Sequence, residues 1–306
     1  MSNHLLKVEK LVTHFKISNG LFGKTTGIVH AVDDISFKIN KSETLSIVGE
    51  SGCGKSTTGR SILKLVPLES GKIIFMNKDI ASLSSNEMQK MRVNMQMIFQ
   101  DPFSSLNPRL TIGNAIAEPL KRHNLFSGKD LKDKVNELLV RVGLLPEHAK
   151  RYPHEFSGGQ RQRICIARAL GPKPALIVAD EAVSALDVTI QAQIINLMMD
   201  LQDEFDISFL FISHDMAVVE RMSHNVAVMY LGRIVEIGSR SQVFENPSHP
   251  YTQKLLNAVP VADPNFTRKS AEILNDEVPS PVKPVGYLTP TVKMKEVENG
   301  HLVSLN

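Results

Sequence analysis

The segment 49–56 constrains this chain more than any other, because it reads Gly-Glu-Ser-Gly-Cys-Gly-Lys-Ser. The apolar run 44–48 precedes it and the helix-compatible run 57–65 follows it, which is the strand–loop–helix order of a phosphate-binding loop. Its glycines allow backbone angles that other residues avoid, so successive N–H groups can turn inward on phosphate. The positive end of the following helix dipole adds to this attraction. The pattern predicts a nucleoside triphosphate site for ATP or GTP.

Two side chains of this segment have specific roles in such a loop. Lys55 can reach the outer phosphates, and Ser56 can hold Mg²⁺. The predicted nucleotide contacts from the loop are Gly49, Glu50, Ser51, Gly52, Cys53, Gly54, Lys55, Ser56 and Thr57.

Bulk properties limit the class of protein. A length of 306 residues exceeds one domain of roughly 100–200 residues, so we expect a main domain with a subdomain or an appended segment. The net charge of +3 gives no support for nucleic acid as a partner. Two cysteines, Cys53 and Cys165, are too few for a disulfide framework or a four-thiolate cluster, and they fit a reducing cytosol. No run approaches roughly 18 apolar residues and no export signal opens the chain, so any membrane role should be peripheral.

Hydrophobic periodicity predicts an α/β fold. Residues 6–15 and 31–39 alternate apolar with polar positions, which is typical of half-buried antiparallel strands, and we expect a loop over 18–30 between them. Residues 175–179 and 207–212 are nearly continuous apolar runs, which indicate parallel strands covered on both faces.

Two further segments differ in character. Residues 111–170 have helical spacing, clearest over 131–142 and 164–170, and little strand character, so we expect a helical subdomain there. From about Ser241 onward prolines become frequent, which predicts an extended, partly ordered C-terminal segment.

An acidic pair follows the apolar run that ends at Ala179. Adjacent side chains on extended backbone point in opposite directions, so Asp180 and Glu181 can serve two different purposes. A phosphate-binding loop needs a metal-side aspartate at the end of a neighbouring strand. We therefore expect Asp180 to hold Mg²⁺ and Glu181 to face water.

Four motifs in a fixed order make the chain resemble the ATP-binding cassette (ABC) ATPases. Residues 156–160, Phe-Ser-Gly-Gly-Gln, resemble their signature motif, and residues 184–187, Ser-Ala-Leu-Asp, resemble their D-loop. Gln100 and His214 resemble the Q-loop glutamine and the switch histidine. Either residue alone would indicate nothing beyond a strand end, and it is the order of the motifs that supports the resemblance.

Within that family the chain is most similar to the ATPases of oligopeptide and dipeptide importers, especially the second of their two paralogous ATPases. Residues 49–61, 97–109 and 151–157 carry this likeness. Residues 246–252, Asn-Pro-Ser-His-Pro-Tyr-Thr, resemble the C-terminal extension of this peptide and nickel importer subgroup.

The resemblance implies a RecA-like P-loop core with an N-terminal antiparallel β-subdomain, a helical subdomain and a C-terminal extension. We expect the core over 1–100 and 171–240, the helical subdomain over 101–170 and the extension over 241–306. Many members of the subgroup have a cysteine cluster in the extension, but residues 279–306 contain no cysteine, so no iron–sulfur cluster is expected.

The resemblance also implies roles for residues of the site. The catalytic residues would be Glu181 as general base, His214, Gln100 and Lys55; the Mg²⁺ ligands would be Ser56, Gln100 and Asp180. Contacts to the ATP of a partner subunit would come from Ser157, Gly158, Gly159, Gln160 and Asp187. Phe15 is the candidate that stacks on adenine, and His30 is a weaker one.

We therefore expect an ATPase, with ATP and Mg²⁺, that powers import of oligopeptides or dipeptides through an ABC transporter. Expected partners are a paralogous ATPase, two transmembrane permeases and an extracytoplasmic solute-binding protein, and the expected location is the cytoplasmic face of the cell membrane. Import of nickel or another small solute is an alternative. A soluble ABC ATPase acting on DNA or ribosomes is a weaker one, because the interval between Gly49 and Ser157 is too short for the long coiled-coil insertion of the DNA-repair relatives.

Overall fold

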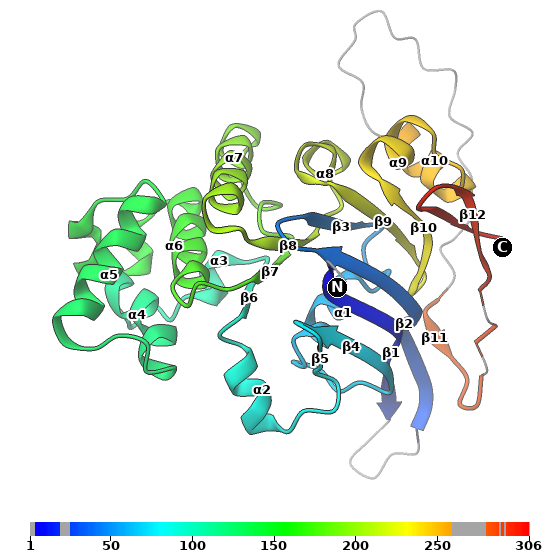
Figure 1. Ribbon diagram of the computed structural model, residues 1–306, viewed down its shortest axis with the longest axis horizontal. Helices are drawn as coiled ribbons and strands as arrows, with labels where there is room; N and C mark the ends of the chain where they lie inside the picture. The colour runs from blue at the N-terminus through cyan, green and yellow to red at the C-terminus, as the bar shows by residue number, and fades with distance from the viewer. Residues whose placement is uncertain (1–3, 19–24, 259–279, 288, 291, 306) are drawn as a thin grey trace, which may run out of the picture.

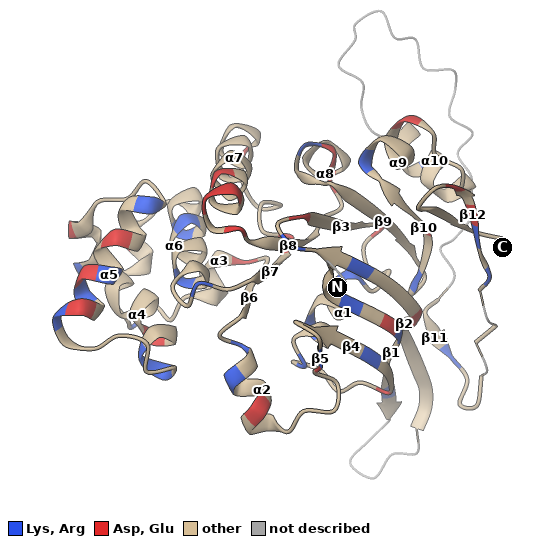
Figure 2. Cartoon of the chain, viewed as in Figure 1, with Lys and Arg blue, Asp and Glu red and all other residues tan. Residues whose placement is uncertain are grey.

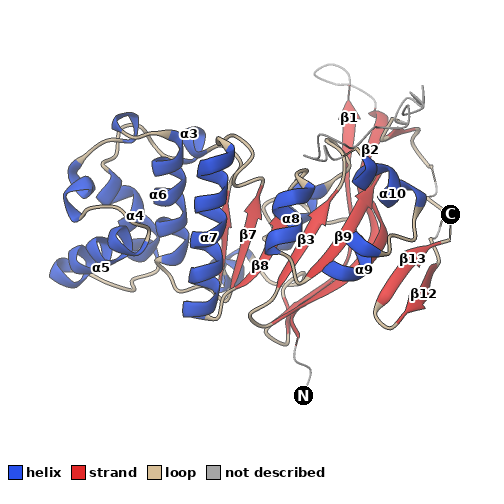
Figure 3. Ribbon diagram, turned by 90° about the horizontal axis from the view of Figure 1, so that it is seen from above, coloured by secondary structure: helices blue, strands red, loops and turns tan. Residues whose placement is uncertain are grey.

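The chain forms two β-sheets and a group of helices at one end of the molecule (Figures 1 and 3). The structure is a computed structural model that describes residues 4–18, 25–258, 280–287, 289–290 and 292–305. Within these ranges one sheet has five strands in the order β11-β2-β1-β4-β5, and the other has eight in the order β12-β13-β10-β9-β3-β8-β7-β6.

The first sheet is antiparallel, as the alternating pattern predicts. Its strands are β1 (His4–Ser18), β2 (Thr25–Asn40), β4 (Ser70–Phe75), β5 (Lys78–Asp79) and β11 (Val282–Lys283). The predicted loop over 18–30 is wrong for residues 25–30, which belong to β2. They pair residue by residue with the end of β1, as in Phe15 opposite Val29 and Ile17 opposite Gly27, so ladder hydrogen bonds override the glycine-rich composition.

The second sheet contains the predicted parallel strands. Its strands are β3 (Thr44–Val48), β6 (Met95–Ile98), β7 (Leu176–Asp180), β8 (Ser208–Ile212), β9 (Asn225–Tyr230), β10 (Arg233–Ser239), β12 (Met294–Glu298) and β13 (His301–Ser304). Strands β9, β3, β8, β7 and β6 run parallel. In β8, Phe209 and Phe211 pack into one hydrophobic cluster while Leu210 and Ile212 pack into the other. Burial on both faces explains why the strand is apolar throughout.

Helix α1 (Lys55–Ile62) lies between the two sheets and joins them into one core. At Gly59 a Cβ atom would come within 2.8 Å of Val178 Cγ1 and 2.9 Å of Ile212 Cδ1. The helix therefore approaches β7 and β8 more closely than a larger residue would allow.

Helices cover the other face of the second sheet and extend beyond its β6 edge (Figure 3). They are α3 (Pro102–Ser105), α4 (Ile112–Arg122), α5 (Gly128–Arg141), α6 (Gly158–Leu170), α7 (Val188–Phe205) and α8 (Met216–Met222), with 3₁₀ turns at Pro146–Lys150 and Pro153–Glu155. Helix α2 (Ser85–Met91) instead packs Met88 into the same hydrophobic cluster as α1. The predicted helical character of 111–170 is confirmed. Helix α5 buries Leu131, Val135 and Leu138 and carries both signs of charge elsewhere (Figure 2). No described helix has both the length and the apolar character that crossing a membrane requires.

The predicted extended C-terminal segment is wrong for residues 240–257. Helices α9 (Arg240–Glu245) and α10 (Pro250–Asn257) occupy this stretch. Ser239 and Gln242 form a capping box that starts α9, and Pro250 starts α10 at the first helical turn, where its missing N–H costs nothing. Pro260, Pro264 and Pro279 lie outside the described residues.

Later residues of this segment return to both sheets. Strand β11 pairs with β2 of the first sheet, and β13 pairs with β10 of the second, so this segment adds strands to both sheets (Figure 1). Both pairings join residues distant in sequence, and proline content gives no sign of them.

Glu236 in β10 fixes the C-terminal segment. Its carboxylate is fully buried and accepts hydrogen bonds from the backbone N–H of Ser248 (2.8 Å) and of His249 (3.0 Å). The ring nitrogen Nε2 of His301, which is also buried, lies 2.7 Å from Glu236 Oε1. One buried carboxylate therefore connects the start of α10 and strand β13 to the second sheet.

We expect Glu236→Ala to lower the free energy of unfolding by about 3–5 kcal/mol, because it leaves a buried imidazole and two N–H groups unpaired. Urea denaturation followed by circular dichroism measures the change. Glu245→Ala, on the exposed side of α9, is the control and should change stability by less than about 0.5 kcal/mol. Equal effects of the two substitutions would contradict the role of Glu236.

Candidate functional site

The phosphate-binding loop lies between β3 and α1 and packs against the backbone of two other strands. Gly49 has φ +149°, and a Cβ there would collide with the carbonyl oxygen of Met229 in β9. Gly54 has φ +106°, and a Cβ there would collide with the carbonyl oxygen of Ala31 in β2. Only glycine fits both positions. The backbone path of the loop is therefore set by its packing against both sheets.

Lys55 lies inside the curve of this loop. Its ammonium nitrogen donates to the carbonyl oxygens of Gly49 and Glu50, each at 2.8 Å, and the residue is 4% exposed. Ser51 and Gly52, at the outer side of the loop, are exposed. This places a fixed positive charge where the loop N–H groups would receive phosphate.

Ser56 and Asp180 meet beside the loop. Ser56 Oγ donates to Asp180 Oδ1 at 2.7 Å, although 124 positions separate the residues. Asp180 is 1% exposed, and its Oδ2 accepts no hydrogen bond from the described residues, the nearest cation being Arg60 at 3.7 Å. Burial raises the pKa of the Asp180 carboxyl, and the Ser56 hydrogen bond opposes this. A buried carboxylate with an unmatched oxygen next to a hydroxyl fits the oxygen donors that Mg²⁺ prefers.

Glu181 is held between two other predicted residues. Gln100 Nε2, which follows β6, donates to Glu181 Oε2 at 2.7 Å, and His214 Nδ1, which follows β8, lies 3.4 Å from Glu181 Oε1. Residues from the carboxyl ends of three parallel strands thus converge at one edge of the sheet. The arrangement holds a carboxylate that can orient a water molecule and accept its proton.

We expected the side chains of Asp180 and Glu181 to point in opposite directions because of strand alternation, and this cause is wrong. Strand β7 ends at Asp180, and Glu181 has φ +47°, in the left-handed region that residues other than glycine rarely adopt. The Glu181 N–H donates to the carbonyl oxygen of Ile212 at 2.9 Å. A left-handed turn held by β8, rather than strand alternation, sends the two side chains apart.

The predicted signature and D-loop residues lie at the starts of α6 and α7. Ser157 caps α6, where its Oγ accepts from the N–H of Gln160 at 3.3 Å and its own N–H donates to Gln160 Oε1 at 3.1 Å. A Cβ on Gly159 would come within 2.6 Å of Ile190 Cγ2, so α6 begins directly against α7. Asp187 is exposed at the N-cap of α7. No hydrogen bond among the described residues links Ser157 to the phosphate-binding loop.

The two adenine candidates differ in their surroundings. Phe15 is half-buried on β1 opposite Val29, and it stays a prediction. His30 is buried, faces Asp33 and has the ring of Tyr287 edge-on at 5.6 Å between centroids, and its role also stays a prediction.

Both cysteines of the chain are buried thiols. Burial raises the pKa of Cys53, although Cys53 precedes a helix start, and burial raises the pKa of Cys165 to about 11. Both stay protonated near neutral pH, which excludes a thiolate nucleophile at this site.

Sequence reasoning missed one residue of the site, Tyr251 in α10. Its hydroxyl oxygen accepts a hydrogen bond from the N–H of Glu50 at 3.1 Å, and its ring packs on Tyr230 at 4.4 Å between centroids. Burial raises the pKa of the Tyr251 phenol, so it stays neutral. Since Lys55 holds the Glu50 carbonyl, the Glu50 peptide units are fixed on both sides. The segment 246–252 resembles the C-terminal extension of the subgroup, but nothing in its sequence indicates that Tyr251 contacts the loop.

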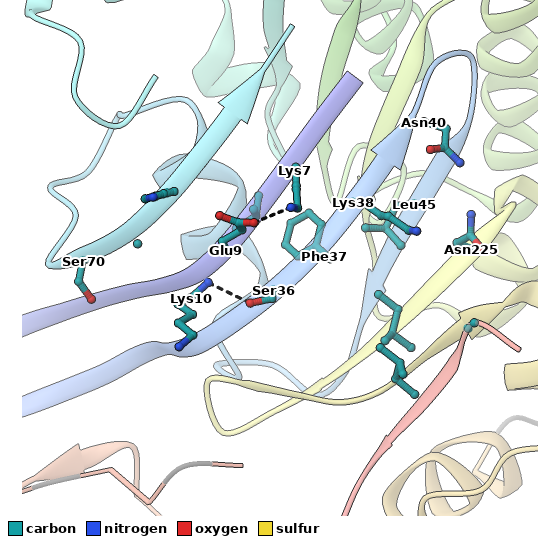
Figure 4. A pocket seen from close by; sticks show the side chains of 17 residues that line it. Lys7, Glu9, Lys10, Ser36, Phe37, Lys38, Asn40, Leu45, Ser70 and Asn225 are labelled. Carbon is teal, nitrogen blue, oxygen red and sulfur yellow. Dashed lines mark hydrogen bonds and ion pairs between the residues drawn. The ribbon is translucent and has the colours of Figure 1, made fainter. Parts of the chain in front are cut away.

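A cavity of about 1000 Å³ lies elsewhere, between β1, β2, β10 and β13. Leu45, near the amino end of β3, is among the residues that line it, whereas the loop follows the carboxyl end of β3. Figure 4 shows Lys7, Lys10 and Lys38 around it, with Lys7 paired to Glu9 at 2.6 Å. None of the predicted catalytic or nucleotide-binding residues lines it, so it is separate from the site described above.

Comparison with known proteins gives a consistent result. The family described as "ABC transporter" matches residues 32–184, and the family described as "Oligopeptide/dipeptide transporter, C-terminal region" matches residues 235–286. The chain is 59% identical over 300 residues to the glutathione import ATP-binding protein GsiA of Escherichia coli and 57% identical to that of Pectobacterium atrosepticum. Each match covers 98% of this chain and 48% of the relative, so the chain spans about half the length of these relatives.

Solved structures share the fold. The structure of cbiO1 from Clostridium perfringens, part of the ABC transporter complex cbiONQ, is 30% identical with a TM-score of 0.68, over 80% of this chain and 92% of that one. A dimeric ATP-binding cassette in a post-hydrolysis state, bound to ADP and Pi, is 26% identical with a TM-score of 0.67, over 77% of this chain and 98% of that one. The predicted P-loop ATPase fold of the cassette type is confirmed.

We expect Tyr251→Phe to weaken nucleotide binding about three- to tenfold, because it removes one hydrogen bond of about 0.5–1.5 kcal/mol from the Glu50 N–H of the loop. Titration with a fluorescent ATP analogue measures the affinity. Tyr152→Phe, which removes a hydroxyl from an exposed residue, is the control. An unchanged dissociation constant for Tyr251→Phe would show that α10 does not support the loop.

Proposed function

Because this chain belongs to the ABC transporter family and carries the C-terminal region of the oligopeptide/dipeptide transporters, we propose that it binds and hydrolyses ATP to power import of short peptides. The observation that carries the proposal is the meeting of Glu181, Gln100 and His214 beside the phosphate-binding loop. A carboxylate held by an amide and an imidazole, next to a loop that holds phosphate, is suited to activate water.

Each residue of the site has a task in hydrolysis. The loop N–H groups and Lys55 hold the phosphates, and Glu181 accepts the proton of the attacking water. Gln100 donates its amide N–H to Glu181, which leaves its carbonyl oxygen free to accept from that water. His214 lies on the other carboxylate oxygen and is 55% exposed, so it can reach the γ-phosphate. Ser56 and Asp180 would hold Mg²⁺, which neutralises charge on the β- and γ-phosphates when bound.

The second half of the site would come from another ATPase subunit. Ser157 and the first N–H groups of α6 form a helix start suited to phosphate, and no hydrogen bond among the described residues connects them to this chain's own loop. Asp187 and Val188 at the start of α7 are also exposed, Val188 by 82%. We infer that two cassettes face each other with ATP between them, the partner being a paralogous ATPase or a second copy of this chain. ATP would then close the pair, and hydrolysis would release it.

An exposed aromatic side chain supports the proposal that membrane subunits bind at α3. Phe103 in α3 is 62% exposed, and the guanidinium of Arg161 lies over its ring at 3.8 Å from the centroid. A large apolar ring exposed on the segment 100–108, between core strand β6 and the helices, is suited to receive a helix from a permease. The protein would therefore act at the cytoplasmic face of the membrane, with two permeases and a solute-binding protein.

The transported solute is proposed from the subgroup. The C-terminal region matches peptide transporters, and the curated relatives cited above are described as glutathione import proteins. Glutathione is a tripeptide, and we propose it as the first candidate within the class of short peptides.

We expect Glu181→Gln to lower ATP turnover by about 100- to 10,000-fold, because the amide cannot accept the proton of the water. ATP binding should persist, since Lys55 and the loop are untouched. Steady-state phosphate release and nucleotide titration measure the two properties, and Glu220→Gln, an exposed carboxylate on α8, is the control. Turnover within a few-fold of the unsubstituted protein would remove Glu181 from the mechanism.

The same variant tests the transport proposal, since an arrested ATPase retains its partners. Purified from its native membrane with ATP, Glu181→Gln should bring along two permeases, an ATPase and a peptide-binding protein. Cells without this chain should lose uptake of labelled glutathione. If uptake of dipeptides or nickel is lost while glutathione uptake is intact, glutathione is not the substrate and the lost solute takes its place. Copurification of ribosomes or DNA-repair proteins would contradict the transport proposal itself.

A further inference from the structure

Three side chains of metal-ligand type meet in the first sheet, outside the nucleotide site. His14 on β1 pairs in register with His30 on β2, and Asp33 lies three residues further along β2. One ligand atom from each of the three lies within 4.8 Å of the others. His30 and Asp33 are 5% and 6% exposed, so they are held away from bulk water.

Three oxygen atoms lie close to one ring nitrogen of His30. Its Nδ1 lies 3.1 Å from Asp33 Oδ2, 3.3 Å from Asp33 Oδ1 and 3.0 Å from Thr289 Oγ1. The Asp33 carboxylate accepts, whereas the Thr289 hydroxyl can donate or accept, so Nδ1 of His30 is shared between a carboxylate and a hydroxyl. A cation at this point would satisfy the carboxylate and the hydroxyl together.

His14 has a carboxylate on each ring nitrogen. Its Nε2 faces Asp33 Oδ1, and its Nδ1 lies 2.7 Å from Glu69 Oε2. Without a metal, a neutral ring has one N–H for two carboxylates, and its centroid lies 3.9 Å from that of the His30 ring, at a tilt of 33°. With a metal on Nε2, a neutral ring suffices, and its Nδ1–H donates to Glu69. A histidine that binds a metal through one nitrogen and a carboxylate through the other is a common metal-site arrangement.

We propose that His14 Nε2, His30 Nδ1 and the Asp33 carboxylate bind one divalent transition-metal ion of the zinc class. Two imidazoles and one carboxylate form a donor set that zinc accepts, with a fourth position for water or for the Thr289 hydroxyl. Glu69 is the residue that orients His14.

A cavity gives the ion a way in. About 250 Å³ of space is lined by His30, Asp33, Tyr287 and Thr289, together with residues of β10 and β11. This volume is enough for a hydrated ion to approach. The C-terminal segment closes one side of it, because β11 pairs with β2 beside His30 (Figure 1).

The site is connected to the phosphate-binding loop by backbone hydrogen bonds. The Asp33 N–H donates to Gly232 O at 2.8 Å, and the Gly232 N–H donates to Cys53 O at 2.9 Å. A bound ion would therefore stiffen the strand that supports the loop, and it would add to stability as any ligand specific to the folded state does.

The test is Zn²⁺ binding to the full chain, prepared without a histidine tag and freed of metal with a chelator. Competition with a chromophoric chelator should show one equivalent bound with a dissociation constant below about 1 μM, and Zn²⁺ should raise the melting temperature. His14→Gln, His30→Gln and Asp33→Asn should each weaken binding at least about tenfold. Circular dichroism and thermal melting without metal show whether each variant is folded.

Two variants sharpen the result. Glu69→Gln keeps all three ligands but should weaken Zn²⁺ binding about tenfold, because it loses the carboxylate that orients His14. His154→Gln, an exposed histidine outside the cluster, is the control and should bind as the unsubstituted protein does. No binding in the micromolar range, or equal binding by the folded ligand variants, overturns the proposal and leaves the three residues as a hydrogen-bonded ion network.

Discussion

The close approach of the phosphate-binding loop to two strand backbones is the constraint on which the rest of the structure depends. Gly49 meets the carbonyl of Met229, and Gly54 meets the carbonyl of Ala31, so the loop can keep its curve only if both sheets stay in place. The curved backbone holds the ammonium group of Lys55 against the carbonyl oxygens of Gly49 and Glu50. It also sets the start of α1, which places Ser56 beside Asp180. Chemistry at the edge of the second sheet therefore depends on packing between the two sheets.

The C-terminal segment supports this arrangement at three separate points. Glu236 fixes the start of α10, Tyr251 of α10 accepts a hydrogen bond from the loop, and strand β11 covers the edge of β2. Each contact stabilises the backbone around the loop, and none of the three involves the proposed catalytic side chains of Glu181, Gln100 and His214. An extension attached in this way can alter the rigidity of the nucleotide site without contributing a reacting group. The proposed metal cluster also contacts this segment, through the Thr289 hydroxyl beside His30.

Local pattern was enough to predict much of the fold. Continuous apolar runs predicted β7 and β8, because a strand that is buried on both faces has no solvent-facing positions for polar side chains. Helical spacing predicted α5 and α6, and alternation predicted the antiparallel β1 and β2. The errors fall where tertiary contacts decide the structure: residues 25–30 read as loop but join β2, and the proline-rich end reads as extended but contains helices α9 and α10. A proline at the first turn of a helix and a proline in a loop look alike in sequence.

The sequence by itself determined which chemical groups the protein has and their order: a phosphate-binding loop, an acidic pair, a glutamine, a histidine and a signature serine. Local motifs of this kind are readable because each depends on neighbours within a few residues. Only the tertiary structure decided which groups meet. It placed Gln100 and His214 on the two oxygens of Glu181, turned Glu181 away from Asp180 through a left-handed backbone, and brought Tyr251 to a loop 201 positions earlier in the chain. These contacts arise from the pairing of strands and the packing of sheets, which join residues far apart in the sequence and leave no periodic trace in it.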